Sequence, residues 1–209
     1  MNIRKTFACL HLWLGIISSV PVAVICATGA IYALREYIAY DNEDFWAWML
    51  DGHCFLWLPL PYGRSIAGYT VLTFMVTLIS GVIIQWPARW TAGAARKRLW
   101  FSGPLRTKRM LMNLHMVLGL WGLLPLIILC LTGMLMALDW FQDIVFIFVP
   151  ENYRMDLLML NSEIHDGSVI GHTGRIIMLV SAIVGSTLPL TGLVLYIRRK
   201  FFLNRTGIK

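Results

Sequence analysis

Charged residues are scarce in this sequence. Asp, Glu, Lys and Arg make up 14% of its 209 residues, while hydrophobic residues make up 58%. Soluble domains usually contain about 25% charged residues, so the composition excludes an ordinary soluble fold. Four stretches, at about 6–34, 65–86, 110–138 and 175–197, have no acid or base in their interior. The shortest covers roughly 33 Å as a helix, enough for the hydrocarbon core of a bilayer, and we therefore expect four transmembrane helices.

Acidic residues are missing from three segments, namely the first five residues, residues 87–109 and the tail from Arg198 onward. These segments hold 14 of the 18 basic residues, whereas all 11 acids fall in 35–64 and 139–174. The positive-inside rule then places both termini and the 87–109 loop in the cytoplasm, with 35–64 and 139–174 as outer segments. The net charge of +7 reflects this topology, so we expect a lipid bilayer as partner and no nucleic acid.

Several motifs of cofactor and nucleotide binding are absent. No Cys-x-x-Cys-His sequence occurs, which excludes the usual covalent attachment of haem c. Neither Gly-x-Gly-x-x-Gly nor the phosphate-binding loop Gly-x-x-x-x-Gly-Lys-Ser/Thr occurs, so no local motif predicts a nucleotide site. The four cysteines form no disulfide framework, and Cys26 and Cys130 are expected to be small packing residues in the membrane.

An internal repeat is present instead. Residues 7–34 and 111–138 align at an offset of 104 with ten identities in 28 positions. The identical pairs are Leu10/Leu114, His11/His115, Leu14/Leu118, Gly15/Gly119, Pro21/Pro125, Cys26/Cys130, Thr28/Thr132, Gly29/Gly133, Ala33/Ala137 and Leu34/Leu138. Because they include His, Pro, Cys and Gly, the match is more than shared apolar composition.

The second half of each copy also corresponds, at an offset of 111. Gly63–Arg64 matches Gly174–Arg175 and Gly81 matches Gly192. Upstream of each Gly–Arg lies a histidine, His53 or His165, at a spacing of eleven or ten residues. The repeated unit is therefore a helix, an outer segment with a histidine, and a second helix, in a parallel repeat.

These observations predict an all-α membrane protein with a single transmembrane domain over residues 1–209. We expect a four-transmembrane-helix bundle built from two parallel helix-pair repeats, with both termini cytoplasmic. The outer segments 35–64 and 139–174 mix aromatic and acidic residues, which favours short interfacial helices or loops over the mouth of the bundle. Pro21 and Pro125 are expected to kink their helices, and Gly29-x-x-x-Ala33 and Gly133-x-x-x-Ala137 to serve close helix packing.

Four histidines form two candidate pairs. His11 and His115 lie near the cytoplasmic ends of the first and third helices, whereas His53 and His165 lie at the outer side. A single interfacial histidine would usually bond a carbonyl or a headgroup, but equivalent histidines in two repeats would face each other. Two facing imidazoles match the axial ligands of a haem iron, so we expect two non-covalent haems b. Gly15 and Gly119 would leave room for the macrocycle.

Three further residues are candidates for the outer site. His172 has no counterpart in the first repeat; it either ligates in place of His165, contacts a propionate, or caps the last helix. Arg64 and Arg175 open the second and fourth helices, and they either neutralise haem propionates or anchor the helices at the interface.

Several motifs together resemble the PepSY-associated transmembrane helix family. They are Leu-His-x-Trp-Leu-Gly at residues 10–15, Leu-His-x-x-Leu-Gly-Leu-Trp at 114–121, and His-Asp-Gly, Gly-Arg-Ile, Thr-Gly-Leu and Arg-Arg-Lys between 165 and 200. The resemblance implies a bacterial inner-membrane protein related to siderophore-iron reductases with two haems b. It places the family's haem-binding histidines at His11, His115, His53 and His165. The outer segments are too short for the periplasmic PepSY domains typical of the family.

The hypothesis that follows is dihaem b electron transfer across the membrane to a periplasmic acceptor, with ferric siderophore implied by the resemblance. Such a protein would be an oxidoreductase whose donor is quinol or a cytoplasmic flavin reductase. The alternative is a metal-ion transport or assembly subunit of a membrane complex without haem.

Overall fold

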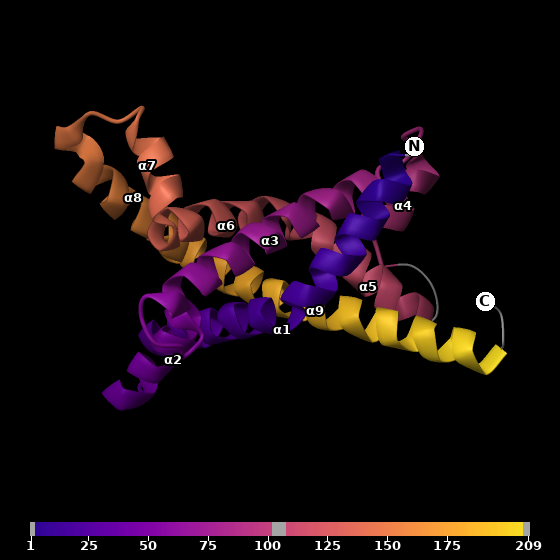
Figure 1. The fold of residues 1–209 in the computed structure, drawn as a ribbon, viewed down its shortest axis with the longest axis horizontal. Coiled ribbons are helices and arrows are strands. Elements are labelled where there is room, and N and C mark those ends of the chain that lie inside the picture. Colours follow the sequence, from indigo (N-terminus) through magenta and orange to yellow (C-terminus); the bar gives the residue numbers. More distant parts are fainter. Residues whose placement is uncertain (1–2, 102–107, 207–209) are drawn as a thin grey trace.

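The computed structural model of the protein describes residues 3–101 and 108–206, so residues 102–107 of the expected cytoplasmic loop lie outside the described residues. The described chain consists of helices and short turns (Figure 1). They are α1 (Ile3–Ala33), η1 (Leu34–Glu36), α2 (Glu43–Phe55), α3 (Tyr62–Gln85), α4 (Ala92–Leu99), α5 (Lys108–Trp121), α6 (Leu123–Ala137), α7 (Asp139–Phe146), η2 (Glu151–Tyr153), α8 (Arg154–Asp166), η3 (Ser168–Ile170) and α9 (Gly171–Thr206). The predicted all-α class is confirmed for this part of the chain.

Within residues 3–101 and 108–206, three segments are long and apolar enough to cross a membrane, namely Ile3–Glu36, Tyr62–Gln85 and Ser168–Lys200. The helices α5 and α6 pass the same test together as a fourth, bent segment. The chain is thus a multi-pass membrane protein, and its described part contains three candidate spans, or four if the bent pair counts as one.

The third expected span is broken rather than kinked. We predicted one helix over 110–138 bent at Pro125, but α5 ends at Trp121 and α6 begins at Leu123, at an angle of 63°. Proline lacks an N–H, and its ring collides with the carbonyl four residues earlier, here that of Trp121. The equivalent Pro21 lies inside the unbroken α1, although Figure 1 shows that α1 also changes direction along its length.

One of the residues that differ near these two prolines favours the break in the second copy. Gly122, between α5 and α6, corresponds to Ser18 in α1. Glycine is the poorest helix former after proline, so it favours a break where serine keeps the helix. The Ser18 hydroxyl also donates a hydrogen bond to the Leu14 carbonyl at 2.7 Å and stays within the helix.

The contacts between the long helices form a closed ring. α1 contacts α3 and α9, α3 contacts α6, and both α5 and α6 contact α9. Their shared core contains one apolar cluster, made of Val22, Phe74, Leu78, Leu126, Cys130 and Leu188, with Cys26 packed against it. The two cysteines are free thiols in this core, in keeping with a packing role.

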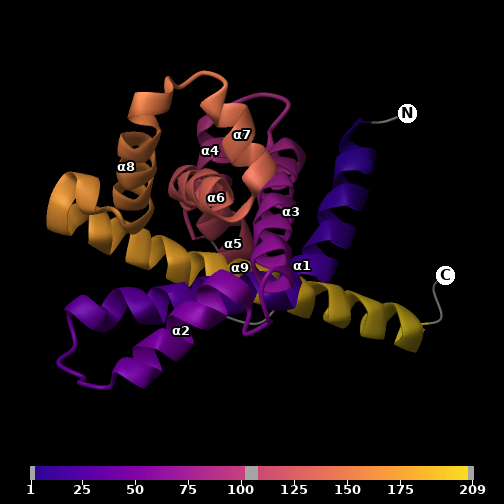
Figure 2. The same cartoon turned by 60° about the vertical axis from the view of Figure 1, so that its left-hand side comes forward.

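The outer segments fold back toward the bundle. α2 packs along α1, and α8 packs along α6, the corresponding helix of the second repeat. Figures 1 and 2 show α7 and α8 as a hairpin that projects from the end of α6, whereas α2 lies beside α1. Because both helices return, a histidine on each reaches the interior of its own repeat.

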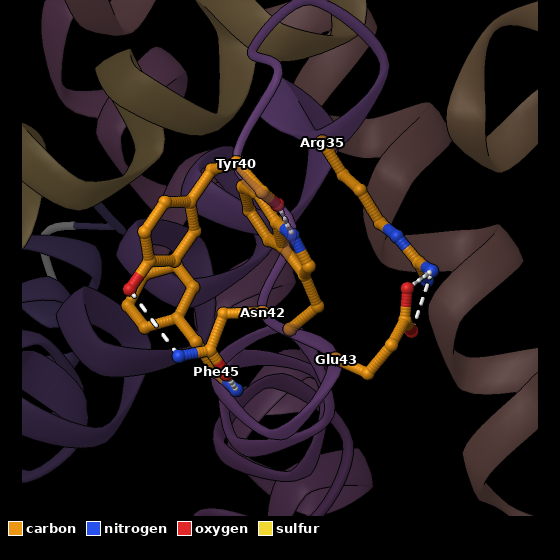
Figure 3. A network of polar contacts seen from close by, with 6 residues as sticks. Arg35, Tyr40, Asn42, Glu43 and Phe45 are labelled. Carbon is orange, nitrogen blue, oxygen red and sulfur yellow. Dashed lines mark hydrogen bonds and ion pairs between the residues drawn. The ribbon is translucent and has the colours of Figure 1, made fainter.

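A network of polar contacts sets the start of α2 (Figure 3). The Asn42 side chain accepts a hydrogen bond from the first helical turn at 2.9 Å and so caps α2. Trp46, which is 3% exposed, donates its indole N–H to the Tyr40 carbonyl at 2.8 Å. Arg35 holds both carboxylate oxygens of Glu43 at 2.7 Å. These contacts fix the direction in which α2 returns along α1.

The cap gives a first prediction. Asn42→Ala removes the side-chain acceptor and should lower the free energy of unfolding by about 1 kcal/mol. The thermal unfolding midpoint of the purified protein in detergent measures the loss. Asn42→Ser keeps a capping oxygen and should stay close to the wild type, so equal midpoints for the Ala and Ser variants would contradict the role of the cap.

Candidate functional site

The structure brings His11 and His115 together. His11 lies on α1 and His115 on α5, and their ring centroids are 6.2 Å apart with an angle of 80° between the planes. The equivalence of the two residues in the repeat predicted that they would face each other. We call these two residues the inner pair.

Each ring of the inner pair is held by its own repeat. Nδ1 of His11 lies 2.9 Å from the Thr77 carbonyl and 3.1 Å from the Ser80 hydroxyl. Nδ1 of His115 lies 2.9 Å from the Thr191 hydroxyl, at the position equivalent to Ser80. Both hydroxyls donate their protons to backbone carbonyls, so they accept from Nδ1–H. Nε2 of each ring is then the nitrogen left free for a ligand.

A glycine lies behind each of these rings. A Cβ atom at Gly81 would stand 3.1 Å from Cε1 of His11, and one at Gly192 would stand 3.3 Å from Cε1 of His115. Both distances are shorter than ordinary van der Waals contact, so only glycine allows the imidazole to lie this close to the helix. Gly81 and Gly192, which match at an offset of 111, therefore make room for the imidazoles of His11 and His115.

The inner pair borders a cavity of ≈ 100 Å³ between α1, α3, α5 and α9. Gly15 and Gly119 line it, as expected for glycines that leave space beside the rings. No Lys, Arg, Asp or Glu is among the lining residues. The cavity is a largely apolar space, and the polar side chains that line it are the two imidazoles, Ser18, Thr77 and Gln85.

A second pair lies at the other end of the bundle. His53 on α2 and His165 on α8 have ring centroids 5.9 Å apart, with 49° between their planes. Nδ1 of His53 lies 2.9 Å from the Ile25 carbonyl, and Nδ1 of His165 lies 2.7 Å from the Thr132 hydroxyl. That hydroxyl donates its own proton to the Ile128 carbonyl at 2.7 Å, so it accepts from His165. We call His53 and His165 the outer pair.

Gly29 and Gly133 face the outer pair, which changes their expected role. We assigned both to close packing between helices. A Cβ at Gly29 would stand 2.6 Å from Nδ1 of His53, and one at Gly133 would stand 3.5 Å from Cε1 of His165. Each glycine thus receives an imidazole from the returning outer helix of its own repeat. The joint recurrence of Gly and His in both copies was the sequence signal for this contact.

The environment of the outer pair keeps its imidazoles neutral. α2 and α8 lie outside the candidate membrane spans, and His53 and His165 are partly buried in the protein. Burial lowers the pKa of His53 below its ordinary value of 6.5. Burial, together with the neighbouring His53, lowers the pKa of His165 to about 4. Neutral imidazole is the form that binds a metal.

His172 is not brought to the outer pair. It is exposed at the start of α9, and its ring lies 5.4 Å from that of Tyr37. Of the three roles that the sequence left open for His172, this position least favours replacement of His165 as a ligand.

The two candidate arginines join the repeats to each other. Arg64 of α3 pairs with Asp139 of the second repeat at 2.9 Å and donates to the Met136 carbonyl at 2.8 Å. Arg175 of α9 pairs with Glu36 of the first repeat. Met136 lies one turn beyond the Thr132 that holds His165, so the ion pair of Arg64 with Asp139 borders the outer site.

Each pair offers two nitrogen ligands. In residues 3–101 and 108–206, no group of three or more His, Cys, Asp or Glu side chains gathers in a metal-binding arrangement. The geometry therefore suits a cofactor that brings its own additional ligands.

Comparison with models of protein families identifies a relationship for this chain. A family model described as the PepSY-associated TM region matches residues 39–152, more than half of the chain. The matched range runs from just before α2 into η2 and contains His53 and His115. No curated protein matches the chain.

The close contact at Gly29 predicts an uneven effect of adding a methyl group. Gly29→Ala should displace the His53 ring and lower the free energy of unfolding by roughly 1–3 kcal/mol, the usual cost of overpacking. Gly133→Ala should cost less, since its Cβ would meet the ring at ordinary distance. Gly93→Ala in α4 is the control, because nothing lies within 4 Å of that position. Thermal unfolding midpoints that rank Gly29→Ala with the control would contradict this packing.

The outer pair should also make the cofactor-free protein sensitive to acid. In the unfolded chain, His165 takes up a proton near pH 6.5, whereas in the folded protein it stays neutral until about pH 4. The stability is therefore fully present above pH 6.5 and is lost as the pH falls toward 4. Unfolding midpoints of the wild type and His165→Gln across this range measure the slope, which should be smaller in the variant. An identical slope in the wild type and in His165→Gln would contradict the assignment.

Proposed function

The chain belongs to the family of the PepSY-associated TM region, and from this premise we propose that it carries electrons across the membrane through two haems b. One haem would be held by the inner pair and the other by the outer pair. The observation that carries the proposal is the presence of two facing histidine pairs, each ring held through Nδ1 by its own repeat.

The residues fit this cofactor in distance. Imidazole nitrogens bind first-row metals at about 2.0–2.1 Å, so an ion between two rings puts the facing nitrogens about 4 Å apart and the ring centres about 6 Å apart. The measured centroid separations are 6.2 Å for the inner pair and 5.9 Å for the outer pair. Each histidine pair would hold the iron of one haem, and the porphyrin would supply the remaining ligands.

The chain's own residues would prepare both sites before the cofactor binds. The hydrogen bonds to Nδ1 fix the tautomer and the rotation of each ring and increase the basicity of Nε2. The apolar core between the pairs excludes water and ions. A bound haem with two histidine ligands supplies a one-electron couple without an open coordination site for substrate.

Two sites are needed because of the distance to be crossed. Along α1, His11 and the Ile25 carbonyl that holds His53 are 14 residues apart, which corresponds to about 21 Å of helix. The hydrocarbon core is roughly 30 Å thick, so one carrier near each side divides the path. The apolar cluster that contains Cys130, with Cys26 packed against it, occupies the space between the two sites.

The charge distribution supports an orientation with both termini in the cytoplasm of a bacterial inner membrane. The outer pair then lies on the side that carries all 11 acids of the chain. We propose a periplasmic ferric complex, of the siderophore class, as acceptor, and the acids favour a neutral or cationic one. The donor would be quinol or a cytoplasmic flavin reductase.

Arg64 and Arg175 are proposed to stabilise the propionates of the outer haem. Arg64 stands at the border of the outer site, and each arginine shares its charge with a carboxylate of the other repeat. A propionate could join either ion pair through a charge-assisted hydrogen bond.

The proposal predicts how single histidine variants divide the haem content. His11→Ala or His115→Ala should remove the inner haem's low-spin signal and leave the outer one, because one imidazole cannot keep the iron six-coordinate. His53→Ala or His165→Ala should do the reverse. Visible spectra and haem content per chain measure both effects, with His172→Ala as the control that keeps both haems.

A colourless wild-type protein, purified from cells supplied with haem, would overturn the proposal and favour the metal-transport or assembly alternative. Loss of both haems in every single variant, with unfolding midpoints unchanged, would contradict two separate sites.

A further inference from the structure

We propose that Gln85 and Arg98 form the carboxylate-binding site of the inner haem, holding its propionates at the Gln85 end of the cavity, where Arg98 lies behind the lining. This inference rests on the proposed function, since it assumes a haem at the inner pair. It assigns a role to the side chain of Gln85, which the site described above does not use.

The first observation is an orphaned polar atom. Gln85 ends α3, one turn after the Gly81 that backs His11, and its side chain lines the cavity of the inner pair. Its Oε1 atom is buried and has no hydrogen-bond partner among the residues that the structure describes. Such an atom is costly unless a ligand satisfies it. A half-turn of the amide places its NH₂ group at the same position, where it can donate to a carboxylate.

The second observation is a fixed positive charge next to Gln85. Arg98 of α4 donates from Nε to the Gln85 carbonyl at 2.5 Å and from Nη1 to the Ala94 carbonyl at 3.3 Å. The guanidinium is partly buried at the end of α3. An amide N–H and a guanidinium together make the charge-assisted contacts that bind a carboxylate strongly.

The other end of the cavity offers no such partner. There the lining consists of Phe74, Leu78 and Ser18, and the Ser18 hydroxyl already donates to the Leu14 carbonyl. A carboxylate placed at that end would be buried without compensation. The polarity of the cavity therefore directs the acidic edge of a macrocycle toward Gln85.

The second repeat does not duplicate this site. Tyr196 stands at the position equivalent to Gln85, one turn after Gly192, but it is not among the residues that line the cavity. The inner carboxylate site would thus lie on the α3 side alone, under α4.

Arg98 also has a structural role, because a cation stabilises the carbonyl end of a helix. The two roles predict different results. A helix cap affects every ligand of the cavity equally, whereas a carboxylate site discriminates between haem b and its dimethyl ester, which has the same macrocycle and iron but no free carboxylates.

The test is reconstitution of the haem-free full-length protein in detergent with haem b and with the dimethyl ester. For each of the two binding steps, the ratio of dissociation constants is measured. In one step, Gln85→Leu and Arg98→Gln should each reduce the preference for haem b by roughly 10-fold or more, as expected for a hydrogen bond to a charged group. The ratio for the other binding step should not change. Gln142→Leu and Lys97→Gln are matched controls, on α7 and on the exposed side of α4, and should keep the wild-type ratios in both steps.

The possible failures are distinguishable. If the wild type binds neither compound with a low-spin spectrum, the proposed function itself fails. If both compounds bind, and Gln85→Leu and Arg98→Gln keep the wild-type ratio, only the carboxylate site is overturned. A variant of Arg98 that weakens haem b and the ester equally shows the capping role alone and also overturns it.

A second measurement covers variants that do not survive removal of haem. Redox-difference infrared spectra of the purified holoprotein, loaded with haem carrying ¹³C at the propionate carboxyls, report the carboxylate bands directly. Gln85→Leu should shift the bands of one haem only. Unchanged bands in a folded Gln85→Leu protein would overturn the inference.

Discussion

The hydrogen bond that holds each imidazole to its own repeat is the constraint on which the rest of the site depends. Without it, a histidine on a membrane helix would turn toward any available carbonyl, and the spacing of a pair would not be defined. In both repeats, Nδ1 is bound to a carbonyl or hydroxyl on a neighbouring helix. A glycine behind the ring then permits the close approach. The pairs are thus set before any ligand binds.

The repeat explains why such contacts occur twice at each end of the bundle. Each repeat carries one inner and one outer histidine, so the two repeats together supply both members of each pair. The repeats are in turn joined by ion pairs, from Arg64 to Asp139 and from Arg175 to Glu36. Such partly exposed pairs contribute little stability individually. A change of charge at the outer site would nevertheless alter their electrostatic interaction.

The sequence was sufficient for the apolar spans and for the histidine pairs, because both follow from local composition and from the repeat. The break at Gly122 was missed, because Pro21 leaves α1 unbroken and the residues around the two prolines differ, with Ser18 at the position of Gly122. The contact between Gly29 and His53 was missed because it depends on how far α2 returns along α1. Partners such as Asp139 were also out of reach, because they come from the opposite repeat.

The central claim is that each histidine pair holds one iron between two imidazoles. Electron paramagnetic resonance of the oxidised protein, combined with the haem content per chain, tests it most directly. The account predicts two haems b per chain, both low-spin with the signals of bis-imidazole iron. High-spin iron at both sites, or a folded protein with no haem after full haem supply, would contradict it.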